Sequence, residues 1–166
     1  MLVLVRPRCT NPAPARTLTG EAIMTESENK ILVRSFAEAG NQNDLPAFDT
    51  ILTPNFVRHS EATPEVTVTT CEEFKQFYRD TAETFPDQRM NLDKLVAEGD
   101  RVAFWGTFSG TQRGPMGPFA PTGKRLVSDC AGMFRIEEGR IAELWVTWDN
   151  LSGLIQLGLF PPPESE

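Results

Sequence analysis

The amino-acid sequence predicts an α+β domain in which helices come first and a meander of long antiparallel strands follows. Helix-capping patterns and helical apolar spacing occur in residues 25–86. Residues 88–149 instead indicate two hairpins, with turn pairs at residues 99–100 and 138–139. We therefore expect a curved antiparallel sheet wrapped around the N-terminal helices, forming a cone-shaped barrel with a central cavity.

The bulk composition indicates an acidic single domain. The chain has 166 residues, which suits one domain, and a formal net charge of −7, which disfavours nucleic-acid binding. No run of about 18 apolar residues occurs, so we expect no membrane span. Three cysteines without a CxxC pair, and His59 as the only histidine, argue against a disulfide framework and a zinc site. We expect a cytoplasmic protein that binds no metal.

Residues 1–23 differ in composition from the rest of the chain. They contain three arginines and three prolines, and no acidic residue before Glu21. We interpret them as a disordered extension, or as a segment upstream of a true start at Met24; a transit peptide is the alternative. The domain is expected to span residues 24–160, followed by a disordered tail over residues 161–166.

Two helices are predicted before residue 54. The first begins after Thr25, which forms a capping-box pattern with Glu28, and extends to Asn41. The second is short and follows Asp44 as its N-cap, with Pro46 in the tolerant first turn.

A short strand is expected over residues 55–60, and a third helix follows a polar loop. This helix begins after Thr70, where the spacing to Glu73 repeats the capping-box pattern, and it ends at Pro86. The Gly- and Pro-rich segment 111–123 separates the two hairpins and favours a loop over the cavity mouth.

The last predicted strand has two different faces. Alternation gives one face aromatic and polar groups, as in a ligand pocket: Ile141, Glu143, Trp145, Thr147 and Asp149. The other face is wholly apolar and suits packing or a dimer contact: Ala142, Leu144, Val146 and Trp148.

The register of the last hairpin has two alternatives. With a two-residue turn at 138–139, small residues leave space in the pocket: Ser128, Cys130 and Gly132 opposite Asp149, Thr147 and Trp145. With a bulge the register slips by one, and the facing residues become Val127, Asp129 and Ala131. In the second case Asp129 is a second carboxylate near Asp149.

Asp149 has two interpretations. A general base that removes a proton next to a carbonyl needs a pKa near the working pH. An apolar wall raises the pKa of a carboxyl group, and Trp145, Phe108 and Phe134 can form such a wall. Alternatively, Asp149 caps the last helix, which is expected over residues 151–160.

His59 and Tyr78 also have two interpretations each. His59 is either a hydrogen-bonding surface residue or a pocket group that donates to an oxyanion or relays a proton. Tyr78 lies on the apolar face of the third helix and either packs in the core or contacts substrate.

Several of these segments together resemble the SnoaL-like polyketide cyclases, also labelled ester cyclases. The similarity covers about residues 27 to 160 and is carried by "ENKILVRSFAEAGNQNDL", "DTILTPNFVRHS", "FPDQRMNLDKLVAEGDRVAFWGTFSGT", "APTGKRL", "FRIEEGRIAELWVTWD" and "LIQLG". The resemblance implies the nuclear-transport-factor-like cone fold, which ketosteroid isomerase shares. It also implies cofactor-independent ring closure by aldol condensation, with Asp149 as the proton shuttle and His59 as a second catalytic residue.

The resulting hypothesis is a cofactor-independent enzyme that acts on a small apolar carbonyl compound by aldol, isomerase or other proton-transfer chemistry. Asp149 is the expected general acid/base. The sequence does not distinguish this reaction from that of a dehydratase or hydrolase that uses water bound to Asp149. The expected substrate-contacting residues are Trp145, Thr147, Tyr78, Phe108, Asp129 and Phe134. The alternative is a non-catalytic binding or dimerisation module of the same fold, and we expect a homodimer in either case.

Overall fold

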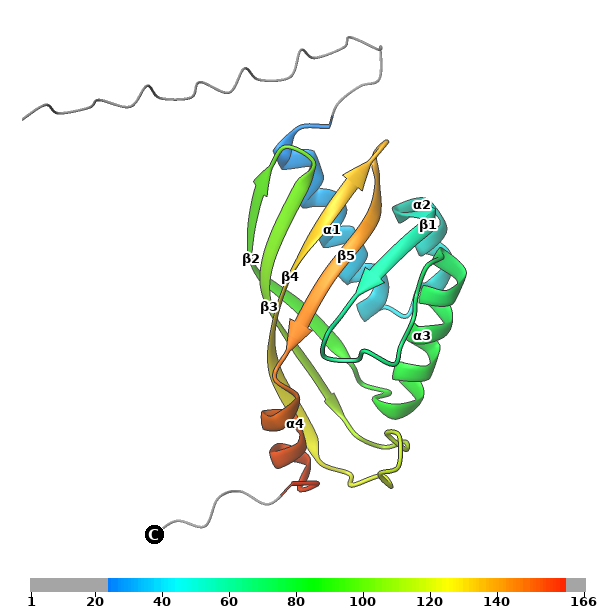
Figure 1. The fold of residues 1–166 in the computed structure, drawn as a ribbon, viewed down its shortest axis with the longest axis vertical. Coiled ribbons are helices and arrows are strands. Elements are labelled where there is room, and N and C mark those ends of the chain that lie inside the picture. Colours follow the sequence, from blue (N-terminus) through cyan, green and yellow to red (C-terminus); the bar gives the residue numbers. More distant parts are fainter. Residues whose placement is uncertain (1–23, 161–166) are drawn as a thin grey trace, which may run out of the picture.

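The computed structural model describes residues 24–160, and the predicted extension and tail lie outside the described residues. The strands form one five-stranded sheet. Figure 1 shows it as a twisted sheet, with α1 crossing behind it and α3 beside β1. In chain order the elements are α1 Glu26–Asn41, the 3-10 helix η1 Leu45–Ala47, α2 Phe48–Ile51, β1 Leu52–His59, α3 Cys71–Thr84, β2 Arg89–Glu98, β3 Arg101–Thr111, β4 Arg125–Glu137, β5 Arg140–Trp148 and α4 Asn150–Leu157.

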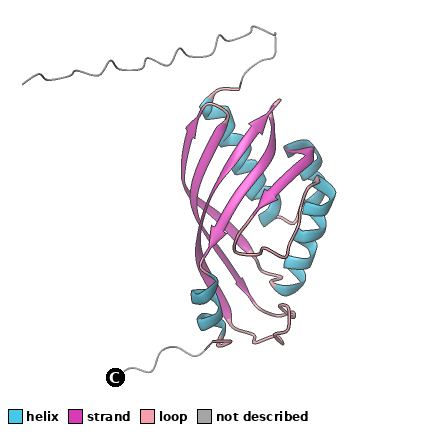
Figure 2. Ribbon diagram, in the orientation of Figure 1, coloured by secondary structure: helices cyan, strands magenta, loops and turns pink. Residues whose placement is uncertain are grey.

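The sheet has the strand order β1-β5-β4-β3-β2. The predicted α+β class is confirmed, and both predicted hairpins, β2–β3 and β4–β5, are antiparallel pairs. Two details differ from the prediction. β1 runs parallel to β5, so the sheet is mixed, and β1 and β2 stay at opposite edges, so the sheet is open and not a closed barrel. Figure 2 shows α1 and α3 on the same side of this open sheet.

The predicted helix caps account for where the helices begin. Thr25 and Glu28 form the capping box: Glu28 N donates to Thr25 Oγ1 at 3.3 Å, and Thr25 N donates to Glu28 Oε2 at 2.7 Å. Thr70 caps α3 by accepting from Glu73 N at 3.1 Å. The Glu73 carboxylate accepts from Thr69 N instead of Thr70 N, so the second predicted box is only half formed.

The core lies between the helices and the inner face of the sheet. Phe36 of α1, Phe48 of α2 and Phe74 of α3 have ring centroids 5.1–5.5 Å apart. Phe134 of β4 is 1% exposed, and its ring lies 5.2 Å from that of Phe36 and 5.3 Å from that of Phe104. These aromatic rings anchor the curved sheet on the helices, because each buried ring removes a large apolar area from water.

The β4–β5 hairpin contains a bulge in β5, which gives a register different from both predicted ones. Glu138 and Gly139 have φ of 50° and 77° and form a two-residue turn. Ile136 pairs with Ile141 but Arg135 pairs with Glu143, so Ala142 is an extra residue in β5.

The bulge slips the register in the direction opposite to the predicted one. Thr147 pairs with Ala131, and Trp145 pairs with Met133. The last pair of the hairpin is Trp148 with Cys130, and β5 ends at Trp148. If the register is continued by one position, Asp149 lies across from Asp129.

The bulge also decides which face of β5 meets the core. Leu144 is buried in the core, and Val146 and Trp148 pack against it. The predicted apolar face is therefore a packing face and not a dimer contact. The predicted pocket face carries Trp145 and Thr147 on the outer side of the sheet, away from the helices.

Candidate functional site

A polar and aromatic cluster lies on the outer face, where β1 ends beside β5. The His59 ring stacks on Trp145 with centroids 4.9 Å apart and planes 13° apart. His59 Nε2 lies 2.9 Å from Glu143 Oε2, and Arg135 Nε donates to Glu143 Oε1 at 2.7 Å. These contacts, that of His59 first, hold the pKa of Glu143 below its ordinary value of 4.5. His59 is therefore part of a surface hydrogen-bond network.

A shallow hollow of about 510 Å³ opens beside this cluster. It is lined by His59, Ser60, Glu61, Ala131, Gly132, Met133, Trp145, Val146 and Thr147. Three predicted site residues, His59, Trp145 and Thr147, are thus brought together. Asp149 is not among the residues that line the hollow.

Asp149 is the N-cap of α4. Its Oδ1 accepts from Ser152 N at 3.0 Å, and the side chain is exposed. The capping alternative is therefore what the structure contains, and no apolar wall surrounds the carboxylate. The neighbouring Asn150 accepts from Trp148 Nε1 at 2.8 Å and donates to Ala62 O at 2.6 Å, which ties the end of β5 to the loop after β1.

A second candidate surface lies on the inner face of the sheet, between the sheet and α3. Its side chains point inward, and five of the eight are half-buried while three are buried. We define this inner surface as Arg58, Phe77, Tyr78, Met90, Phe108, Ser128, Cys130 and Trp148.

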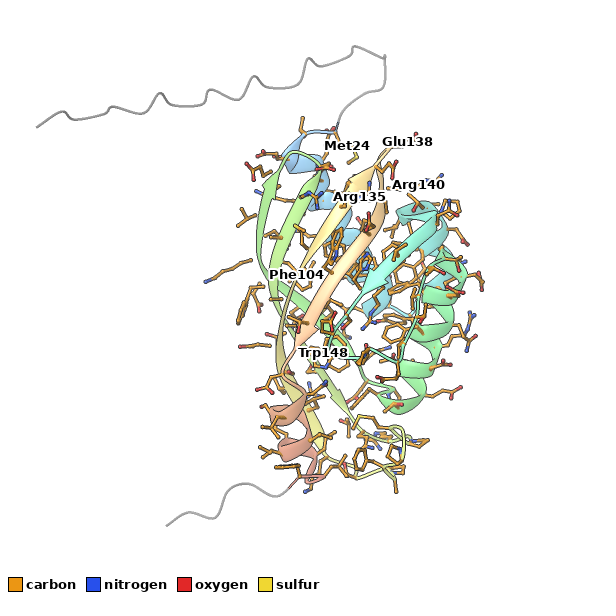
Figure 3. The ribbon with its side chains drawn as sticks, viewed as in Figure 1. Met24, Phe104, Arg135, Glu138, Arg140 and Trp148 are labelled. Carbon is orange, nitrogen blue, oxygen red and sulfur yellow. The ribbon has the colours of Figure 1, made fainter. Side chains whose placement is uncertain are left out.

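The strand register places this row of side chains side by side. Met90 pairs with Phe108 and Phe108 with Ser128, while Cys130 pairs with Trp148. Ser128 and Cys130 are the small side chains of this row and are both buried. Figure 3 shows Trp148 at the end of β5 far from the turn that Glu138 marks.

Arg58 is the charged member of the inner surface. It is 6% exposed, and its guanidinium carbon lies 4.6 Å from the Phe77 ring centroid and 5.6 Å from that of Trp148. Nη2 donates to Thr63 Oγ1 at 3.0 Å, but Nη1 has no hydrogen-bond partner. Burial lowers the pKa of Arg58 to about 10, and the charge of Glu65 opposes this shift, so the group is protonated at neutral pH.

Sequence reasoning missed Arg58, although a signal was present. In "NFVRHS", alternation places Phe56 and Arg58 on one face and His59 on the other. Phe56 is fully buried, which marks the inner face, so an arginine two residues later faces the interior. His59, the only histidine of the sequence, is the neighbour of Arg58 that faces outward.

Tyr78 packs in the core, which is the first of its two predicted roles. Its ring packs 5.8 Å from Phe48 and 6.2 Å from Phe74, so it contributes to the core. Burial raises the pKa of its hydroxyl to about 12, so the hydroxyl stays protonated and can donate a hydrogen bond. A Cβ added at Gly40 would come within 2.7 Å of that hydroxyl, so glycine there makes room for the tyrosine.

The remaining predicted residues fall in three places. Phe108 lies on the inner surface, where its ring packs against Phe85 with centroids 5.7 Å apart. Phe134 is buried in the core, so its side chain is not accessible to a substrate. Asp129 is exposed, and the strand's alternation directs it to the outer face of β4.

The described residues contain no group of three or more His, Cys, Asp or Glu side chains able to hold a metal ion. Cys71 and Cys130 are free and buried, and burial raises the pKa of both thiols, that of Cys130 to about 11. Within residues 24–160, no helix is long and apolar enough to cross a membrane.

Solved structures share this architecture. A protein described as having a ketosteroid isomerase-like fold, from Catenulispora acidiphila, matches with a TM-score of 0.66 at 19% identity, covering 79% of this chain and 97% of its own. TsrD from Streptomyces laurentii matches with a TM-score of 0.73 at 31% identity, covering 82% of this chain and 99% of its own. IdmH from Streptomyces antibioticus, described as a candidate polyketide cyclase, matches with a TM-score of 0.70 at 29% identity, covering 78% and 98%.

The open curved sheet packed on α1 and α3 thus defines a protein of the ketosteroid isomerase-like fold class. The model of the SnoaL-like polyketide cyclase family matches residues 30–157, and the chain belongs to that family. No curated protein matches the chain closely enough to be counted as a relative.

Proposed function

We propose that this protein is a cofactor-independent enzyme that binds a small, mostly apolar carbonyl compound at the inner surface. The observation that carries the proposal is Arg58, a buried guanidinium with an unpartnered Nη1 between two aromatic rings. Proton removal next to a carbonyl places negative charge on the carbonyl oxygen. A fixed cation in a water-poor site stabilises that charge, and the protonated Tyr78 hydroxyl is a second donor from the same surface.

The identity of the base is the finer part of this proposal. Among the residues of the inner surface none is a carboxylate, since its ionisable members are Arg58, Tyr78 and Cys130. Asp149 follows Trp148 directly in the chain, and the family resemblance assigns it the proton transfer. We propose that the carboxylate acts at the rim of the inner surface, after releasing the N–H of Ser152.

An assay that does not require the natural substrate to be known tests the role of Asp149. The α-protons of 2-tetralone, a small apolar ketone, exchange in deuterated water, and proton NMR measures the rate. We expect wild-type protein to accelerate exchange over buffer, and Asp149→Asn to lower the rate by about 10²–10⁴-fold, the usual contribution of a positioned general base. Asparagine is a good N-cap, so this variant keeps α4 capped while removing the base.

Asp100→Asn is the matched control, because Asp100 is an exposed carboxylate in the β2–β3 turn. Its exchange rate should equal that of the wild type. Full exchange by Asp149→Asn would remove Asp149 from the mechanism. Wild-type exchange no faster than buffer would contradict the enzymatic proposal itself.

The outer face favours a second function, homodimerisation, which corrects the predicted dimer face. Trp105 is 51% exposed and Val127 is 48% exposed there, and the hollow beside His59 continues this apolar area. Arg101 and Arg135 lie on the same face as Glu143 and Asp93, so a second copy related by a two-fold axis can pair opposite charges.

Analytical ultracentrifugation tests the dimer. We expect wild-type protein to sediment as a dimer and Trp105→Lys to weaken association at least tenfold, because a charge would replace the apolar ring at the interface. Ile31→Lys is the control, since Ile31 is an exposed apolar residue on α1 and not on the outer face of the sheet. A monomeric wild type at high micromolar concentration would overturn this second function.

A further inference from the structure

Arg58 carries a positive charge that its surroundings do not balance. Among the described residues no carboxylate forms an ion pair with it, although Glu65 acts on it through its charge. Other arginines of the chain, such as Arg135, have carboxylate partners. The Phe77 and Trp148 rings and the Thr63 hydroxyl offset only part of the desolvation cost of the buried guanidinium. A counter-anion is therefore expected.

One hydrogen bond holds the backbone of Arg58, and another holds its guanidinium. The backbone N–H of Arg58 donates to Val68 O at 3.0 Å, and Nη2 donates to Thr63 Oγ1 at 3.0 Å. The second contact fixes the guanidinium, and Nη1 is buried without a hydrogen-bond partner. A fixed planar donor of this kind matches the geometry of a carboxylate.

The surroundings of Arg58 determine the rest of the ligand. Phe77 and Trp148 lie beside the guanidinium, and Met90 and Phe108 extend the apolar row across the sheet. A ring compound that packs against these side chains brings its charged end to Nη1 by displacing one of the groups that bury this atom. The chain's net charge of −7 repels anions in general, so the preference for an anion must come from this one residue.

We propose that the inner surface binds an apolar ring compound bearing a carboxylate, and that Arg58 is the specificity-determining partner of that carboxylate. The inference rests on the proposed function for the location of the site, and it narrows the substrate class from a carbonyl compound to a carbonyl compound that is also an organic acid. With Nη1 assigned to the carboxylate, the Tyr78 hydroxyl is the donor that remains for the carbonyl oxygen.

Isothermal titration with two isosteric probes, 2-naphthoate and neutral 2-naphthamide, tests the inference on the full chain. We expect the wild type to bind 2-naphthoate at least about tenfold more tightly than 2-naphthamide, which corresponds to about 1.4 kcal/mol. Arg58→Met should abolish this preference while changing the Kd for the amide by less than about threefold. Arg58→Lys should keep part of the preference, because it keeps the charge but not the planar donor.

Arg79→Met is the matched control, because Arg79 is a half-exposed arginine on α3 that pairs with Glu72. This variant should bind both probes as the wild type does. If Arg58→Met does not fold, the side-chain NMR signals of Arg58 in wild-type protein, followed during titration with 2-naphthoate, carry the test. They should shift on binding, whereas those of Arg79 should not.

Three results would overturn the inference: no binding of 2-naphthoate, equal affinity for the two probes, or a preference that survives in Arg58→Met. These results are distinct from a failure of the proposed function. If the protein exchanges 2-tetralone protons but does not prefer the carboxylate probe, the enzymatic proposal stands and only the proposal of an organic-acid substrate fails. A carboxylate preference without exchange would indicate a binding protein.

Discussion

Replacement of Phe134 by alanine is expected to lower the free energy of unfolding by about 3–5 kcal/mol. Phe134 is 1% exposed, and its ring contacts Phe36 of α1 and Phe104 of β3. Truncation leaves a cavity at the point where the first helix meets the centre of the sheet. The two surrounding rings come from two different elements, α1 and β3, so they can close the cavity only by moving whole segments. Urea denaturation followed by circular dichroism measures the loss.

Phe108→Ala is the matched control for this prediction. Phe108 has the same side chain on the inner surface, where it is only half-buried, and its main aromatic contact is Phe85. We expect a smaller loss of stability than for Phe134→Ala, together with weaker 2-naphthoate binding. Equal destabilisation by the two variants would contradict the assignment of Phe134 to the core and of Phe108 to the ligand-binding surface.

Replacement of Gly106 by alanine is expected to lower the free energy of unfolding by about 1–3 kcal/mol, the usual effect of overpacking. A Cβ at this position of β3 would collide with the backbone oxygen of Asn91 in β2. The obstacle is backbone, so it cannot move aside as a side chain can. It lies beside the register shift between Leu92 and Lys94, where β2 bends closely over β3.

Ala103→Val provides the control within the same strand. Ala103 is exposed on the outer face of β3, and we expect its replacement to change the unfolding free energy by less than about 0.5 kcal/mol. Both variants are compared with the wild type by urea denaturation. A Gly106→Ala protein as stable as Ala103→Val would show that the β2–β3 approach relaxes without strain.

The two faces of the sheet suit different binding partners. The outer face combines exposed apolar side chains with paired charges, which suits a partner of the same kind. The inner surface combines aromatic rings with an unpaired buried cation, which suits a small anionic ligand. His59 and Arg58 are adjacent in sequence but serve opposite faces, because β1 alternates between them. Cofactor independence and a cytoplasmic location stay predictions.

The sequence by itself determined the order of helices and strands, the caps at Thr25, Asp44 and Thr70, the two hairpins and the family. These features depend on residues that are only a few positions apart. Their capping hydrogen bonds and apolar periodicity can therefore be recognised in the local sequence. The capping alternative for Asp149 belongs to this group, since its partner is the N–H of Ser152, three residues away.

Only the tertiary structure decided which side chains share a surface. Strand periodicity is two, so one extra residue exchanges the faces of everything beyond it, and no local pattern marked Ala142 as that residue. The parallel pairing of β1 with β5 joins segments about 85 residues apart, and it brings His59 to Trp145. The burial of Arg58 between Phe77 and Trp148 likewise requires three segments to meet. Such contacts depend on the packing of distant elements, which the residue order near Arg58 does not specify.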